Sequence, residues 1–345
     1  MSIITIVGSG VMGGALSVPA SDNGHETRLV GTSLDRDIIE HARKTGEHLT
    51  LKRKLPKTNK YYQIEQLDEA LKGADLVVCG VNSFGVDWFG ENVLCNLPKN
   101  LPVLSVTKGM FNMDDGTLIP YPMYYGSKYP DAPWVNAVGG PSMSYELADL
   151  DPTAVAFCGK DVEQLRFIKK LFSTDYYHIS VSTDIVGVTC AVAMKNAYAL
   201  AVSLAFGLVE KKEGKSVHHY NSQSALFGQS VKEMRDLLKI VGGADENIIY
   251  GAGDLFVTVF GGRTRKLGTL LGMGMRFDDA MAQMAGVTLE SVIIAKRTAQ
   301  AIYKLIERGI ATREQFPLLL HLDEIISGDK PVNIPFKAFE TETIL

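Results

Sequence analysis

The sequence predicts an α/β fold in which a doubly wound parallel sheet is followed by an all-helical domain. Short apolar runs alternate with segments of helical period through the first half of the chain. The first run ends in a glycine-rich turn at residues 8–13, which opens a helical pattern. From about residue 184 strand signals nearly vanish and long segments of helical period take over. We therefore expect a Rossmann-like N-terminal domain over residues 1–184 and a helical domain over residues 185–345.

The expected strands are short apolar runs bounded by turn residues. Ile3–Val7 precedes the glycine-rich turn, and Glu26–Val30 follows the turn signal Asp22-Asn23-Gly24. The further strand candidates are Asp75–Val81, Pro102–Val106, Trp134–Val138 and Thr153–Cys158.

The expected helices follow the apolar period of 3.6 residues. A helix from Val11 should be shortened or kinked at Pro19, because proline removes a backbone donor. Leu34–Arg43 has Asp35 as a candidate N-cap, and residues 112–131 should form an irregular excursion. In the second half the expected helices are Ile185–Leu208, Ser222–Val241, Thr269–Leu271, Phe277–Ala285, Leu289–Arg308 and Arg313–Ile326.

Composition excludes several classes of function. Apolar residues at 46% and charged residues at 21% describe an ordinary globular protein, and the 345 residues suffice for two domains. A net charge of −4 argues against a nucleic-acid partner. We expect a cytoplasmic chain without a membrane span, because no leader and no uninterrupted apolar stretch of about twenty residues is evident.

Cysteine and histidine usage argues against disulfides and metals. Four cysteines lie far apart without metal-ligand spacing: Cys79, Cys95, Cys158 and Cys190. His218 and His219 are adjacent and lack an evident third ligand, so we interpret them as a solvated pair and expect no metal site.

The glycine-rich turn predicts a dinucleotide site. Gly8, Gly10 and Gly13 fit G-x-G-x-x-G directly after a strand: the first permits the tight turn, the second lets a pyrophosphate approach the backbone, and the third lets the helix pack on the strand. Val11 and Met12 begin the helix, whose N-terminal N–H groups favour phosphate.

The end of the second strand bears on the choice of cofactor. It carries Gly31-Thr32-Ser33 where an NAD-preferring site usually has Asp or Glu. Thr32 and Arg36 can meet a 2′-phosphate, although Arg36 equally fits a solvated helix position. We expect NADP or NAD as cofactor, with NADPH favoured.

Lys195 is the one cation in the eighteen-residue run CAVAMKNAYALAVSLAFG. A lysine in such surroundings costs free energy unless its ammonium is paired or its stem reaches solvent. This makes it a candidate for proton chemistry.

Three further segments have the character of functional loops. Ser105–Gly109 (SVTKG) follows a strand and carries Lys108, and Gly139–Ser142 (GGPS) offers amides and a hydroxyl to an oxyanion or phosphate. Gly251–Leu255 (GAGDL) and Gly261–Lys266 (GGRTRK) pair a carboxylate with a cationic glycine-rich turn.

Six segments in this order resemble the soluble NAD(P)-dependent glycerol-3-phosphate dehydrogenases, nearly from end to end: GSGVMG, SVTKGM, GGPS, AMKN, GAGDL and GGRTR. The resemblance implies a Rossmann domain followed by a helical domain. It also implies reversible reduction of dihydroxyacetone phosphate to sn-glycerol 3-phosphate, the backbone precursor of glycerolipids.

The resemblance assigns roles to individual residues. Lys195 would exchange a proton with the substrate's C2 oxygen, and Asp254 would orient it and accept from a substrate hydroxyl. Lys108 would polarise the carbonyl and touch both substrate and nicotinamide. The remaining implied contacts are Gly140, Ser142, Arg263 and Thr264 to the substrate, and Ser144, Arg263 and Glu290 to the cofactor.

This chemistry is reasonable from first principles. Hydride arriving at a ketone leaves a developing alkoxide, which needs a nearby cation and then a proton, and a lysine can supply both. Lys108 would destabilise the charged form of Lys195, whereas Asp254 would stabilise it. The planar fork of Arg263 suits phosphate oxygens.

The sequence departs from the family pattern at four positions. Thr264 stands where the family has Asn, which removes one donor near the substrate phosphate and keeps open a dehydrogenase of another polyol or sugar phosphate. Met12 replaces an aromatic residue, Asn82 a proline and Ser291 a glycine.

A protein of another class would bind nucleotide without catalysis. It would bind NADPH, oxidise it with no ketone phosphate, and tolerate Lys195→Ala. The joint presence of Lys108, Lys195 and Asp254 argues against it. We expect a phosphorylated ketone or polyol as substrate, and the apolar helices favour a homodimer.

Overall fold

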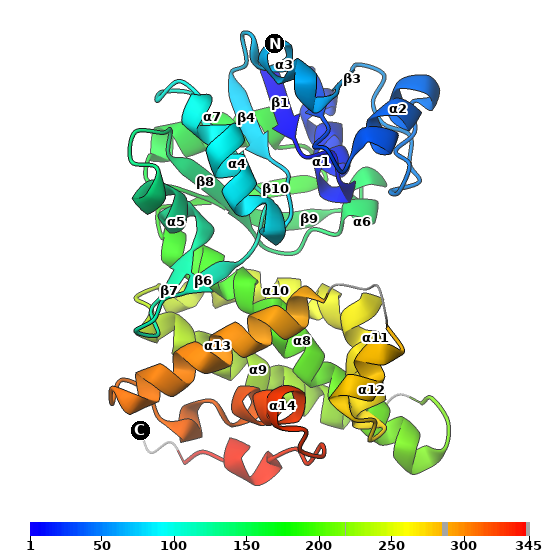
Figure 1. The fold of residues 1–345 in the computed structure, drawn as a ribbon, viewed down its shortest axis with the longest axis vertical. Coiled ribbons are helices and arrows are strands. Elements are labelled where there is room, and N and C mark those ends of the chain that lie inside the picture. Colours follow the sequence, from blue (N-terminus) through cyan, green and yellow to red (C-terminus); the bar gives the residue numbers. More distant parts are fainter. Residues whose placement is uncertain (218, 285–288, 343–345) are drawn as a thin grey trace. The chain divides into compact units, whose positions relative to one another are not determined.

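The computed structural model describes residues 1–217, 219–284 and 289–342, and the chain forms two compact units (Figure 1). Met1–Gly109 and Pro120–Thr189 make up the first, here called the sheet unit. Met110–Ile119 and Cys190–Leu345 make up the second, the helical unit.

An eight-stranded sheet forms the centre of the sheet unit, in the order β10-β9-β8-β5-β4-β1-β2-β3. Its strands are β1 (Ile3–Val7), β2 (Glu26–Val30), β3 (Lys60–Tyr62), β4 (Leu76–Cys79), β5 (Val103–Ser105), β8 (Val135–Gly139), β9 (Thr153–Cys158) and β10 (Tyr177–Ser182). Neighbouring strands run parallel except β8 and β9, which pair antiparallel. The predicted α/β class is confirmed, but the sheet is not wholly parallel. The connection from β8 to β9 contains only the five-residue helix α6 (Ser144–Ala148), whereas parallel crossovers usually need a longer helix.

Helices cover the sheet and bury its central strands. These are α1 (Val11–Asp22), α2 (Arg36–Thr45), α3 (Leu67–Leu71), α4 (Val86–Asn92), α5 (Tyr121–Lys128) and α7 (Val162–Phe172). Ile6 of β1 pairs with Leu29 of β2 and Val78 of β4, and all three are buried in the main core with Leu16 of α1 and Ile168 of α7.

Several expectations for the sheet unit are corrected. Helix α1 is not shortened at Pro19: it continues to Asp22, and its segment Gly13–Ala20 is buried. Residues 112–131 are not irregular: they contain β7 (Leu118–Pro120) and α5. The short strands β3 and β10 were not predicted, since neither begins as a long apolar run.

The helical unit contains α8 (Ile185–Glu213, which starts in the sheet unit), α9 (Tyr220–Ile240), α10 (Ile248–Val259), α11 (Gly262–Gly272), α12 (Phe277–Ala282), α13 (Glu290–Glu307) and α14 (Pro317–Gly328). The described residues after 184 contain no strand, as predicted. The segment Gly251–Leu255, expected as a loop, lies inside α10. The predicted helix end at Ala285 lies outside the described residues.

Glycines allow α8 and α11 to approach closely. A Cβ at Gly207 would lie 2.0 Å from Thr269 O, and one at Gly272 would lie 2.2 Å from Leu204 O. Larger residues would therefore force the two helices apart.

Among the described residues, α8 is the one helix long and apolar enough to cross a membrane, with a mean hydropathy of 1.6. However, 83% of that apolar window is buried inside the protein, which is typical of a core helix. Lys195 interrupts the apolar run of α8, in keeping with the expectation that no uninterrupted apolar stretch of about twenty residues occurs there.

A β-hairpin of β6 (Met110–Asn112) and β7 packs on α13 within the helical unit. Its turn presents two carbonyl oxygens to cations one helical turn apart: Lys304 Nζ donates to Asp114 O, and Arg308 Nη1 donates to Asp115 O at 2.9 Å. Gly116, with φ +88°, comes so close that a Cβ would lie 2.8 Å from Lys304 Cβ.

Candidate active site

The glycine-rich turn connects β1 to α1 in the sheet unit. Gly8 has φ +103°, and a Cβ there would lie 2.6 Å from the carbonyl carbon of Gly80. A Cβ at Gly13 would lie 2.1 Å from Gly8 O, so this position must also be glycine. Both therefore serve the tight strand-to-helix turn.

Gly10 is glycine for a different reason. It is the N-cap of α1, no described side chain caps the helix there, and a Cβ at Gly10 would meet nothing within 4 Å. The protein itself does not require glycine at this position, whereas a pyrophosphate close to the backbone would. The N–H groups of Val11 and Met12 lie in the first turn of α1, so the turn fits a dinucleotide.

The end of β2 lies beside this turn. Asp35 Oδ2 accepts from Thr32 N at 2.9 Å, from Thr32 Oγ1 at 2.8 Å and from Ser9 N at 3.2 Å. Asp35 is the N-cap residue of α2, as predicted, but its carboxylate makes no cap bond to that helix. Arg36 begins α2, is exposed and pairs with Glu65, whose carboxyl pKa this hydrogen bond lowers.

Lys108 lies in the loop after β5, and its Nζ donates to Gly140 O at 2.9 Å. Gly140 has φ +121°, and a Cβ there would lie 3.1 Å from Val155 Cα, so glycine sets the direction of that carbonyl. Ser142 follows in the same segment, and the buried Ser144 begins α6. The structure thus brings together two predicted site segments that lie 32 residues apart.

Lys195 and Asp254 form the most buried ion pair of the helical unit for which both partners are described. Lys195 Nζ donates to Asp254 Oδ1 at 2.5 Å, and the two side chains are 17% and 1% exposed. The apolar surroundings predicted for Lys195 are real, and the charge is compensated by a carboxylate rather than by solvent alone. Removing one partner of such a pair typically costs about 3–5 kcal/mol.

Gly251 explains how the two helices come close enough for this pair. A Cβ on Gly251 would lie 2.6 Å from Ala191 O of α8. Asp254 is three positions after Gly251 and Lys195 four positions after Ala191, so both pairs lie along matching faces of α10 and α8.

The remaining predicted residues lie at two helix starts. Arg263 and Thr264 lie in the first turn of α11, whose N-cap Gly261 is followed by Gly262 at φ +80°. Arg263 is exposed, and the uncompensated N–H groups of a helix start favour phosphate. Glu290 is the first residue of α13.

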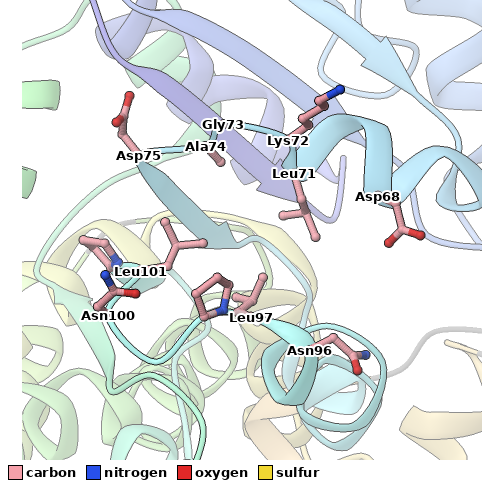
Figure 2. Close-up of a pocket in the computed structure, with 12 residues that line it drawn as sticks. Asp68, Leu71, Lys72, Gly73, Ala74, Asp75, Asn96, Leu97, Asn100 and Leu101 are labelled. Atoms are coloured by element: carbon pink, nitrogen blue, oxygen red, sulfur yellow. The ribbon is translucent and has the colours of Figure 1, made fainter.

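A pocket of about 670 Å³ lies elsewhere in the sheet unit (Figure 2). Its lining includes Lys72 and Asp75 before β4 and Pro102 before β5, so it lies at the amino ends of these strands. Ligands of open α/β sheets bind at the carboxyl ends, where the glycine-rich turn and Lys108 are found. We therefore do not assign it to the active site.

Sequence reasoning missed two buried ionisable residues. His48 is fully buried, and its Nε2 lies 2.9 Å from Ser9 O. Glu233 of α9 is fully buried and accepts four hydrogen bonds. Neither lies in a recognisable motif, and each directly follows a charged residue, Glu47 or Lys232, so the local sequence gives no sign of their burial. His218, interpreted as a surface residue, lies outside the described residues.

Comparison with known proteins identifies the family. Residues 3–165 match the NAD-dependent glycerol-3-phosphate dehydrogenase N-terminus, and residues 184–337 match the C-terminus of the same family. The chain belongs to the NAD-dependent glycerol-3-phosphate dehydrogenase family. It is 33% identical to an NADP(+)-dependent glycerol-3-phosphate dehydrogenase of Archaeoglobus fulgidus, over 88% of this chain and 89% of the relative. It is 27% identical to a glycerol-3-phosphate dehydrogenase [NAD(P)+] of Shouchella clausii, over 89% and 87%.

Solved structures of the family share the fold. The Plasmodium falciparum glycerol-3-phosphate dehydrogenase matches with a TM-score of 0.82 at 18% identity, covering 100% of this chain and 96% of that one. The Coxiella burnetii enzyme matches with a TM-score of 0.77 at 22% identity, covering 98% and 97%. The predicted enzyme class, family and use of NAD or NADP are confirmed by these relatives.

Proposed function

We propose that the protein reduces dihydroxyacetone phosphate reversibly to sn-glycerol 3-phosphate, with Lys195 as the proton donor at the C2 oxygen. The observation that carries this assignment is the ion pair of Lys195 with the buried Asp254, within a chain that belongs to the glycerol-3-phosphate dehydrogenase family. A bound NAD(P)H supplies the hydride. The product would serve glycerolipid synthesis in the cytoplasm.

The proton and charge balance assigns each residue a task. When C2 accepts a hydride, the electron pair of its C=O bond moves onto oxygen, and the Lys195 ammonium stabilises the resulting alkoxide. Lys195 Nζ then transfers a proton to that oxygen, and solvent returns one to the amine. Asp254, held at 2.5 Å, orients the ammonium and neutralises its charge between turnovers.

Lys108 would polarise the same carbonyl. Its Nζ is already directed by Gly140 O at 2.9 Å, so the side chain does not need to be ordered when substrate arrives. Gly140 and Ser142 would contact the substrate. Arg263 and Thr264, at the start of α11, would bind the phosphate, where a helix N-terminus and a guanidinium act together.

The cofactor would lie on the turn formed by Gly8, Gly10 and Gly13, with Val11 and Met12 at the helix start. Ser144, Arg263 and Glu290 are proposed as further contacts. Arg36 would leave its ion pair with Glu65 and bind the 2′-phosphate of the cofactor instead. NADPH is therefore the favoured cofactor. We also propose a homodimer, for which the apolar helices are the only support.

The test follows cofactor absorbance with dihydroxyacetone phosphate, using NADH and NADPH in parallel. Lys195→Ala should lower kcat by about two to four orders of magnitude, as expected for loss of a general acid. The matched control is Lys212→Ala, which removes an exposed lysine from the same helix and should leave turnover unchanged. Near-normal kcat in Lys195→Ala would remove Lys195 from the mechanism, and no consumption of either cofactor by the unmodified protein would refute the activity.

A further inference from the structure

The backbone of Ser9 is held from both sides by side chains. Ser9 N donates to Asp35 Oδ2 at 3.2 Å, and the ring Nε2 of His48 lies 2.9 Å from Ser9 O. Ser9 is 1% exposed and lies between Gly8 and Gly10. Both backbone hydrogen-bonding groups of this residue are thus used by protein side chains.

The geometry of His48 fixes its protonation. Its Nδ1 accepts from Leu51 N at 3.1 Å and from Thr50 N at 3.3 Å, so the proton of the neutral ring lies on Nε2 and is donated to Ser9 O. Burial lowers the pKa of His48, which favours this neutral form. The imidazole is therefore a fixed donor.

Gly14 makes room for this imidazole. A Cβ at Gly14 would lie 2.4 Å from His48 Cδ2, although α1 could otherwise accept alanine there. The second glycine of the Gly13-Gly14 pair is thus explained by His48, whereas Gly13 serves the turn itself. No ligand needs to be invoked for this position.

Asp35 is committed to the turn rather than directed at a nucleotide. The same Oδ2 that accepts from Ser9 N also accepts from Thr32 N and Thr32 Oγ1, at 2.9 and 2.8 Å. An acid at the end of the second strand usually meets the ribose hydroxyls of NAD. Here it joins the end of β2 to the glycine-rich turn.

We propose that Asp35 and His48 are positioning residues of the dinucleotide site: they clamp the backbone N–H and C=O of Ser9 and thereby preorganise the N-terminal amides of α1 for the pyrophosphate. Asp35 does not discriminate NAD from NADP. This inference rests on the proposed function, in that the glycine-rich turn must bind the cofactor.

The first test displaces His48 without removing it. Gly14→Ala is compared with Gly126→Ala, a matched control in α5 of the sheet unit, whose new Cβ would lie 2.4 Å from a ring atom of Trp134. Binding of NADPH and NADH is measured by calorimetric titration, and the melting temperature is measured without cofactor. Both variants should lower the melting temperature, but only Gly14→Ala should raise Kd, about tenfold for both cofactors, which corresponds to about 1.4 kcal/mol.

Three further variants test each side chain. His48→Ala should raise both Kd values about tenfold, and His48→Gln, which keeps an amide donor, should recover part of the loss. Asp35→Ala should raise both Kd values by a similar factor and leave their ratio unchanged. In the free protein, amide hydrogen exchange in residues 8–16 should speed up in these variants but not in Gly126→Ala.

The outcomes separate this inference from the proposed function. If the unmodified protein binds neither cofactor, the proposed function fails. If it binds them, and Gly14→Ala behaves as Gly126→Ala does, the clamp has no role in binding and the inference is wrong. A shift of tenfold or more in the ratio of the two Kd values for Asp35→Ala would show that Asp35 reads the ribose instead.

Discussion

Glu233 should make the stability of the helical unit depend on pH. This carboxyl accepts from Gln229 Nε2 and Leu318 N through one oxygen, and from Tyr198 Oη and Leu319 N through the other, at 2.7–3.1 Å. Burial raises its pKa from the ordinary 4.5 to about 7, even though the four donors oppose this. The difference corresponds to about 3 kcal/mol, since one pKa unit is worth about 1.36 kcal/mol.

The sign follows from proton binding. Between pH 4.5 and about 7 the folded protein keeps the proton on Glu233 and the unfolded chain does not, so stability falls as pH rises through this window. Below pH 4.5 both states hold the proton, and above about pH 7 neither does. Replacing Glu233 with glutamine should therefore remove up to about 3 kcal/mol of pH dependence.

The assay is hydrogen exchange of the peptide that contains Leu318 and Leu319, with and without urea, at pH values from 4.5 to 8. The difference in opening free energy between the unmodified protein and Glu233→Gln isolates the carboxyl from every other titrating group. A difference that stays constant across this range would refute the reasoning, because it would mean that Glu233 is ionised throughout.

Three further perturbations test other features. Gly207→Ala places a methyl group 2.0 Å from Thr269 O and should lower the free energy of unfolding by about 1–3 kcal/mol in urea titrations. The control Gly228→Ala has open space around its Cβ and should not lower it. Equal effects of the two variants would show that close packing of α8 on α11 is not the cause. Arg36→Ala should raise the Kd for NADPH about tenfold and leave the Kd for NADH unchanged in binding titrations. An equal increase of both Kd values would show that Arg36 does not bind the 2′-phosphate. Gly116→Val combines φ +88° with a close approach to α13 and should speed hydrogen exchange in residues 110–119; unchanged exchange would contradict the packing described for the hairpin.

Local patterns predicted much of the fold. The strands Ile3–Val7, Glu26–Val30 and Thr153–Cys158 occur with the predicted bounds. Ile3–Val7 and Thr153–Cys158 are mostly apolar, as buried strands of a largely parallel sheet are, and the turn signal Asp22-Asn23-Gly24 marks the approach to Glu26–Val30. The predicted N-cap Asp35 also lies at the start of α2. The local predictions based on Pro19 and Gly251 were wrong. Pro19 lies inside a helix, and Gly251 belongs to α10 because helix packing, not a turn, requires glycine there.

Long-range pairing could not be predicted from residue patterns. Lys195 was conspicuous by its surroundings, but its contact with Asp254, 59 positions away, depends on how α8 and α10 pack. His48 reaches Ser9 across 39 positions from a loop without a motif. The partners of such side chains are determined by tertiary packing, so local propensity and periodicity cannot predict these contacts.

The hairpin on α13 also imposes an order of events on synthesis. Its turn contact joins Lys304 to Asp114, which are 190 positions apart. At about 5–20 residues per second, a ribosome needs about 10–40 s to make the intervening chain. Met110 and Leu118, buried in the finished protein, therefore wait without their partner helix during that time. The helical unit can close only once its last third has emerged, and a fragment starting at Cys190 would lack the strands that cover α13.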